Sequence, residues 1–285
     1  MHPAPDSPPP FEHRVRINRP PCWAGLVFIY FKERIQYRFE FVVTLVASLL
    51  YSVMYFVVWK AIFESSNSMP MGWTELITYV MVGQAINMAR FSPAERKPVE
   101  TMNKRIMNGD IALDLLRPLG FQSQRFIEAF SYFLSETLWV NIPLLVVFVA
   151  YLGVAPPATA MQLAAFIASM FLAFLVGFGF NVIILTLAFY TRNAFGAQFA
   201  KRAVIDIFAG TLIPFQLFPD WFRVIVEHLP FKAIAYIPLS IWTGRIAGEA
   251  AAWALLEQIM WGALLIGISF LVWHRAMKII TVQGG

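Results

Sequence analysis

The sequence predicts an all-α integral membrane protein, and its composition and hydropathy support this prediction. Apolar residues make up 59% of the 285 residues and charged residues only 14%, whereas soluble domains carry about 25% charged residues. The mean hydropathy is +0.63, and several apolar stretches approach the ~20 residues that a helix needs to cross a bilayer. One membrane bundle takes up nearly the whole chain, so no segment is left for a second hydrophobic core.

Metal and disulfide chemistry find no support in the sequence. Cys22 is the only cysteine, which excludes an internal disulfide and any cysteine-based metal site. The four histidines are scattered and show no metal-ligand spacing. No nucleophile and base stand in a catalytic arrangement either. We therefore predict no metal site and no catalytic residues.

The N-terminal part divides into a tail and an amphipathic helix. Residues 1–21 are polar and proline-rich, which predicts a disordered cytosolic tail and not a cleaved signal peptide. Over residues 22–40, aromatic and aliphatic side chains recur at helical spacing with basic side chains among them. This pattern predicts an interfacial helix on the membrane surface. The alternative is that these residues are the cytosolic end of the first spanning helix.

Six apolar segments are candidate transmembrane helices within a membrane domain that covers residues 41–278. A helix rises about 1.5 Å per residue, so each segment was placed by length and apolar content. Residues 279–285 are left as a second cytosolic tail. The predicted spans are residues 41–62, 74–91, 127–152, 161–190, 203–218 and 251–273.

The distribution of basic residues predicts the orientation. With the N-terminus inside, 18 of the 22 Lys and Arg residues fall on the inner side. The positive-inside rule then places both termini in the cytosol, with the chain in the inner (plasma) membrane. The outer side keeps Lys60, Arg223, Lys232 and Arg245.

Residues 219–244 are apolar but are interrupted by charged side chains and by Pro230 and Pro238. A continuous span would place charges and backbone breaks at membrane depth, which lipid does not tolerate. We expect an outer re-entrant hairpin of two short helices that meet near Pro230. The alternative, a kinked seventh span, would leave Arg275 and Lys278 on the outer side, against the positive-inside rule.

The first cytosolic loop, residues 92–126, contains a short capped helix in the sequence "NGDIALDLLRPLG". Gly109 ends the preceding helix, Asp110 can cap the next one, and Pro118 stops it after about two turns. Such a short helix is marginal alone, so something must pack on it. It is either a loop helix resting on its own bundle or an element that inserts into a cytosolic partner.

Three stretches resemble the membrane subunits of ABC-2-type transporters, in the branch without a fused ATPase. These are "FKERIQYRFEF" at 31–41, "GDIALDLLRPL" at 109–119 and "GTLIPFQLFPDWFRVIVEHLPFKAIAYIPLSIWTG" at 210–244. The likeness runs from about residue 22 to 278. The resemblance implies a coupling helix that contacts the ATPase, formed by Gly109, Asp110, Ile111, Ala112, Leu113, Asp114, Leu115, Leu116, Arg117 and Pro118.

The resemblance also implies partners and a division of labour. Two permease subunits, identical or sister chains, would form the path of an exporter driven by two cytosolic ATPase subunits. The chain contains no G-x-x-x-x-G-K-[ST] motif, and "GFGFN" at 177–181 lacks the lysine. We therefore expect this chain to bind no cofactor, and ATP and Mg to bind the partner ATPase. Membrane lipid is an expected partner, and nucleic acid is not.

Two sets of residues are candidates for the transport path. Polar and small residues on one face of otherwise apolar spans are candidates for its lining, although such residues also make ordinary interhelical contacts. The proline- and phenylalanine-rich outer stretch supplies candidate gate residues. The lining set is Ser52, Tyr55, Tyr79, Gly83, Asn87 and Asn181, and the gate set is Pro214, Phe215, Phe218, Pro219, Trp221 and Pro230.

A rival interpretation rests on Glu136, Asp206 and Glu257, which lie inside predicted spans. Buried carboxylates are costly in a membrane and can form a proton relay, so a proton-coupled secondary transporter is the alternative function. Against a relay, Asp206 is expected near the inner end of its span and Glu257 near the outer end. The dependence of transport on a separate ATPase discriminates between the two functions.

Overall fold

The computed structural model describes residues 25, 38–66, 68–91, 120–187 and 194–283. These residues form helices and short connections, with no strand among them. The helices are α2 (Arg38–Ser65), α3 (Trp73–Phe91), α6 (Phe121–Glu136), the π-helix η1 (Thr137–Asn141), α7 (Ile142–Tyr151), α8 (Ala160–Leu187), α9 (Ala194–Phe208), the 3-10 turn η2 (Phe215–Leu217), α10 (Asp220–Glu227), the 3-10 turn η3 (Pro230–Ala233), α11 (Tyr236–Trp242) and α12 (Glu249–Gln283).

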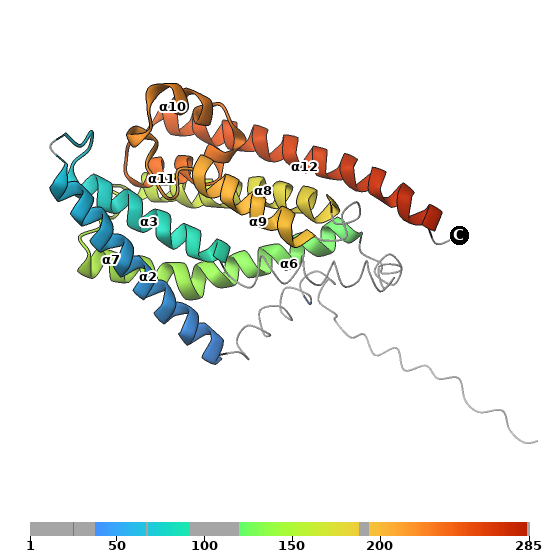
Figure 1. Cartoon of the computed structure of the whole chain (residues 1–285), viewed down its shortest axis with the longest axis horizontal. Helices are drawn as coiled ribbons and strands as arrows, with labels where there is room; N and C mark the ends of the chain where they lie inside the picture. The colour runs from blue at the N-terminus through green and yellow to red at the C-terminus, as the bar shows by residue number, and fades with distance from the viewer. Residues whose placement is uncertain (1–24, 26–37, 67, 92–119, 188–193, 284–285) are drawn as a thin grey trace, which may run out of the picture.

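The long helices run lengthwise between two ends of one bundle (Figure 1). One end is formed by residues 68–72, 152–159 and 209–248, and we call it the hairpin end. The C-terminal end of α12 lies at the opposite end, together with the start of α6 (Figure 1). The chain therefore passes back and forth between the ends, as a multi-pass membrane protein does.

Four helical stretches among the described residues are long and apolar enough to cross a membrane: Val42–Ser65, Phe121–Tyr151, Ala160–Leu187 and Glu249–Ala276. The all-helical membrane fold is therefore confirmed, whereas the count of six spans stays a prediction. α3 and α9, the other two segments predicted to span, are shorter. Every side chain of α3 from Leu76 to Asn87 is buried, so protein and not lipid surrounds this helix, which allows it to carry polar residues.

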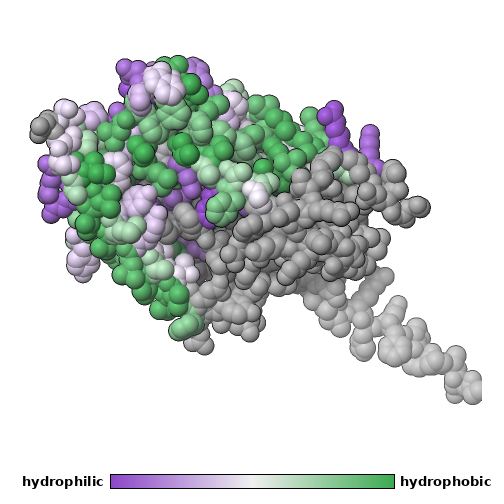
Figure 2. All heavy atoms as spheres, viewed as in Figure 1, coloured by the Kyte–Doolittle hydropathy of each residue, from purple (hydrophilic) through white to green (hydrophobic). Residues whose placement is uncertain are grey.

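α2 exposes apolar side chains and buries polar ones, the reverse of a helix in a soluble protein. Its exposed face is apolar and includes Leu50, Val53 and Val57, whereas the serines Ser48 and Ser52 are buried. Apolar residues form a continuous band along this helix (Figure 2). An outward apolar face is stable only against hydrocarbon, so this surface agrees with a membrane location.

α8 and α12 pack closely along much of their length. At Gly179 the backbones are so close that an added Cβ would lie 2.8 Å from Leu265 Cβ. Small residues allow such close approach between membrane helices. This helix pair forms a scaffold on which the residues of the hairpin end are fixed.

The π-helical turn η1 joins α6 to α7. Pro143 explains why the π turn lies at this point. Pro143 lies at the start of α7, and a proline inside a helix cannot donate its backbone hydrogen bond and collides with the preceding turn. The wider π turn just before it accommodates this break, as such turns commonly do in kinked helices. The break lies in mid-helix, beside α3.

Several predicted boundaries are wrong. α6 begins at Phe121, which stacks on Trp273 with ring centroids 4.0 Å apart, so residues 121–126 of the predicted loop 92–126 are helical. The fifth span, predicted at 203–218, is α9 at Ala194–Phe208. Gly210 has a φ of +74°, a conformation that suits glycine and ends a helix. α12 continues through Gln283, so most of the predicted tail at 279–285 is helical.

Three predicted features lie outside the described residues. They are the cytosolic tail at 1–21, the interfacial helix at 22–40 apart from residues 25 and 38–40, and the coupling helix at 109–118. Their structures stay predictions.

Candidate functional site

The hairpin end is built from short helical pieces that begin at prolines. Pro214 precedes η2, Pro219 precedes α10, and Pro230 opens η3. A proline at a helix start has a suitable φ and lacks only an N–H that would have no partner there. Two short helices, α10 and α11, lie on either side of Pro230–Ala233, and the predicted re-entrant hairpin stays a prediction. Entry of this segment into the membrane stays a prediction.

Predicted gate and path residues meet at Gly210. The Tyr79 hydroxyl of α3 donates a hydrogen bond to the Gly210 carbonyl at 2.9 Å. A Cβ added to Gly210 would lie 2.7 Å from the ring of Phe215. Phe215 is fully buried, and its ring stacks on Tyr236 at 4.3 Å. Residue 210 must therefore be small so that α3 and the hairpin end can contact each other.

Gly83 and Trp221 show two different environments within the predicted sets. Gly83 packs against the hairpin end, because its Cβ position is 3.2 Å from the Thr211 carbonyl oxygen and 3.4 Å from Leu239. Trp221 on α10 is 69% exposed, while Phe218 packs edge-on against Phe222 at 4.9 Å. Gly83 therefore lies in a helix contact, and Trp221 presents an apolar ring on the surface.

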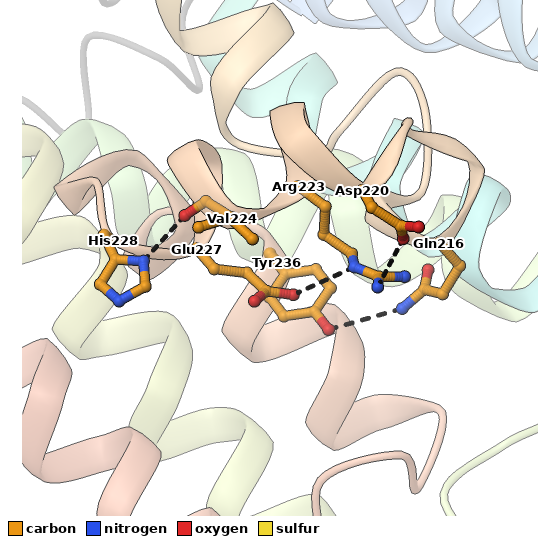
Figure 3. A network of polar contacts seen from close by, with 7 residues as sticks. All are labelled: Gln216, Asp220, Arg223, Val224, Glu227, His228 and Tyr236. Atoms are coloured by element: carbon orange, nitrogen blue, oxygen red, sulfur yellow. Dashed lines mark hydrogen bonds and ion pairs between the residues drawn. The ribbon is translucent and has the colours of Figure 1, made fainter.

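Polar contacts lie along α10 and beside it (Figure 3). Arg223 lies between two carboxylates, 2.8 Å from Asp220 and 3.9 Å from Glu227. His228 Nδ1 donates to the Val224 carbonyl oxygen at 2.8 Å, and Gln216 donates to the Tyr236 hydroxyl at 3.4 Å. The Arg223 pairs are substantially exposed, so each contributes little to stability.

Every cation predicted to lie on the outer side forms an ion pair at the hairpin end. Lys232 Nζ lies 2.8 Å from Glu257 and joins η3 to α12, and Arg245 contacts Glu75 and joins the loop before α12 to α3. Lys60 lies 3.9 Å from Glu64, and the Arg223 pairs complete the set. Carboxylates outnumber these four cations near this end: they are Glu64, Glu75, Asp206, Asp220, Glu227, Glu249 and Glu257.

The predicted path residues of α2 and α8 make contacts within the chain. The Ser52 hydroxyl donates to the Ser48 carbonyl oxygen at 2.7 Å, and Tyr55 packs on Tyr51 with centroids 5.2 Å apart. Asn181 accepts a hydrogen bond from Lys201 of α9. Ser52 and Asn181 therefore have partners in this conformation.

Asn87 differs from these residues, and so does Gln84, which the sequence analysis missed. Both side chains are at most 1% exposed, and neither amide has a hydrogen-bond partner at its nitrogen or oxygen among the described residues. The Tyr55 hydroxyl lies near the Gln84 amide, but outside hydrogen-bond geometry. Gln84 was missed because the predicted face followed residues 79, 83 and 87, although residues 76–87 of α3 are all buried. Its polarity was the available signal.

The three carboxylates of the rival interpretation lie in different environments. Glu257 pairs with Lys232, and Asp206 lies 3.9 Å from Arg202. Asp206 was expected near the inner end of a span at 203–218, but α9 ends at Phe208, so Asp206 lies near the end of its helix, next to the hairpin end. The side of the membrane on which this end lies stays a prediction. Glu136 is buried just before η1 and interacts within the chain. The described residues hold no group of three or more metal-ligating side chains.

A family profile described as ABC-2 family transporter protein matches residues 49–284. The chain belongs to this family. The match covers most of the chain, including residues 92–119, α3 and the hairpin end. No curated protein matches the sequence.

Family membership and fold together give a coarse assignment. The chain is a multi-pass membrane permease of an ABC transporter, and the family implies ABC ATPases as partners. The sequence-based assignment to ABC-2-type permeases is therefore confirmed.

Proposed function

We propose that the chain is the permease subunit of an ATP-driven exporter in the inner (plasma) membrane, with both termini in the cytosol. Two permease subunits, identical or sister chains, form the substrate path. Two cytosolic ATPase subunits bind ATP and Mg and drive it, and residues 109–118 form the coupling helix that contacts them. The observation that carries the proposal is the family match over residues 49–284, which includes this segment and the hairpin end.

The charge distribution supports the orientation. The four cations predicted on the outer side lie near the hairpin end together with seven carboxylates, whereas the other 18 of the 22 cations are predicted on the opposite side. A cation excess marks the cytosolic face of membrane proteins. The hairpin end is therefore the outer face in this proposal, and the coupling helix lies at the opposite end.

The proton-coupled alternative gains less support. Glu257 and Asp206 each lie beside a cation, and an adjacent cation stabilises the charged form of a carboxylate. Glu136 stands as a buried carboxylate apart from them in mid-helix. A relay needs carboxylates that exchange protons in sequence, and this arrangement places two of the three in ion pairs.

Affinity purification tests the coupling helix. We expect the tagged full chain to copurify an ATPase from its native membranes, and Leu113→Glu and Leu116→Glu to reduce the recovered ATPase about tenfold or more, because a charge on an apolar anchor must be desolvated in the contact. Lys104→Gln, outside the short helix, is the matched control and keeps the ATPase. Equal ATPase recovery by the Glu variants, at equal permease levels in the membrane, would refute the coupling role.

A further inference from the structure

We propose that Gln84 and Asn87 of α3, with Asn141 of η1 and Tyr55 of α2, form a substrate site that takes an uncharged hydrogen-bonding group carrying hydroxyls or amides. This inference rests on the proposed function and adds the position of the site and the chemical class of the substrate.

The residues lie at a common depth in the bundle. Gln84 is about 16 Å along α3 from Trp73, and Asn141 is about 15 Å along the helix from Tyr151, at 1.5 Å per residue. Both reference residues adjoin the hairpin end, because α3 begins directly after residues 68–72 and α7 ends directly before residues 152–159. α3 packs against both η1 and α2, and Tyr55 approaches Gln84 from α2. The amides therefore belong to one region in mid-bundle.

The hydrogen-bonding capacity of this region is unused. Among the described residues, neither Gln84 nor Asn87 has a hydrogen-bond partner for its side-chain nitrogen or oxygen. The Thr137 hydroxyl and the side-chain amide oxygen of Asn141 also lack one within the described part of the chain. The exposed fractions of Gln84, Asn87 and Asn141 are 0%, 1% and 4%. Buried polar groups in proteins nearly always have partners, so several unpartnered groups in one region point to a ligand.

The helices around this region also contain a turn that can act as a hinge. η1 is a π-helical turn held next to Pro143, and π turns inside helices mark hinges and functional sites. Separation of α2 or η1 from α3 would open the amides to a ligand. A site that is closed in one state and open in another is what alternating transport requires.

The unused groups define the substrate chemistry. An amide offers a donor and an acceptor and carries no charge, so it matches hydroxyl or amide groups. Glu136, the carboxylate next to η1, already interacts within the chain. A charged ligand would lose its hydration here without a free counter-ion, which is costly. The site therefore favours a neutral polar group, and the apolar side chains around it favour an amphiphilic molecule.

Probes with one alkyl chain and three head groups test this chemistry. An octyl glucoside, an octyl trimethylammonium salt and an octyl sulfate, each below its micelle concentration, are titrated onto the full chain in lipid nanodiscs. We expect saturable binding of the glucoside, with at least about tenfold weaker binding of both charged probes. Equal affinity for all three probes, or preference for a charged one, would overturn the assigned substrate class.

Variants locate the site. Gln84→Met and Asn87→Leu keep the side-chain volume close to the original and remove the hydrogen-bonding groups, so each should weaken glucoside binding about tenfold. Ser240→Ala, which removes another buried polar group without a partner among the described residues in α11, is the control and should bind as the original chain does. Thermal unfolding and size-exclusion profiles confirm folding. Unchanged glucoside binding by both variants would refute the location.

The experiments distinguish a failure of the proposed substrate site from a failure of the proposed ATP-driven function. Nucleotide hydrolysis by the copurified complex of the original chain tests the ATP-driven function alone. Hydrolysis without selective glucoside binding refutes the site and leaves the permease function standing. Selective glucoside binding by a chain that recruits no ATPase refutes the function and leaves a ligand site.

Discussion

Two buried glutamines divide the bundle into regions with opposite properties. Gln258 on α12 and Gln84 on α3 are both 0% exposed. The Gln258 amide donates to the carbonyl oxygens of Ala233 at 2.7 Å and Ser169 at 3.2 Å, and its oxygen accepts from the Ser169 hydroxyl at 2.8 Å. Within the part of the chain that the structure describes, the Gln84 amide has no hydrogen-bond partner at its nitrogen or its oxygen.

This difference in hydrogen bonding separates a rigid scaffold from a region that can open. Gln258 joins α12, α8 and the 3-10 turn after Pro230 into one unit, and Gln162 does the same for α8 and α11 through the carbonyl oxygens of Ile241 and Trp242. Satisfied polar networks make a buried region rigid and specific. The region of α2, α3 and η1 has polar groups without such bonds, so it is the part suited to opening.

The largest effect is expected at Gln258. Gln258→Met leaves the Ser169 hydroxyl and the Ala233 carbonyl without their bonds, so the free energy of unfolding should fall by about 3 kcal/mol. The apparent unfolding temperature in detergent, followed by size exclusion, measures it. Similar melting of the variant and the original chain would show that this network is not a rigid scaffold.

The next largest loss of stability is expected at the close contact between α8 and α12. Gly179→Ala places a Cβ 2.8 Å from Leu265 Cβ and 3.0 Å from its backbone, which forces α8 and α12 apart and should cost about 2 kcal/mol. Gly177→Ala is the control on the same helix, where nothing lies within 4 Å of the added Cβ. Equal melting temperatures for the two variants would contradict the close packing.

Gln84→Met should act in the opposite direction from Gln258→Met. Replacing an unpartnered buried amide by an apolar side chain of similar volume removes a desolvation penalty, so the free energy of unfolding should rise by about 1 kcal/mol. Parallel melting curves of the two methionine variants compare the regions directly. A loss of stability at Gln84 would mean that its amide is bonded, and the contrast would fail.

The smallest effect is expected at the surface. Arg245→Gln breaks the ion pair between Arg245 and Glu75, in which the two side chains are 28% and 38% exposed. The free energy of unfolding should therefore fall by under about 1 kcal/mol. The loss should shrink further at high salt because screening weakens such pairs. A large and salt-independent loss would show that this pair fixes the hairpin end to α3.

The sequence predicted the long helices well, because their apolar content and length leave few alternatives. Helix ends were harder to predict. Gly210 stops α9 and shifts Asp206 to the hairpin end, but a glycine next to an apolar run gives only a weak stop signal. Phe121 extends α6 through its stacking on Trp273, a contact between residues far apart in the sequence that periodicity cannot reveal.

The candidate site was only partly predictable for a similar reason. Tyr79, Gly83 and Asn87 were selected as one face of a helix, yet residues 76–87 of α3 are all buried. Gln84 therefore became visible only once its burial and its lack of partners were known. Pro143 was a sequence signal for η1, but the π turn itself depends on how α6 and α7 pack around that proline.

Transport by the full chain in proteoliposomes, with and without its copurified ATPase, tests the central claim most directly. The account predicts movement of a neutral amphiphile such as octyl glucoside that requires both ATPase and ATP, and that persists when the proton gradient is collapsed. Transport by the chain alone, driven by a proton gradient without ATP, would contradict it.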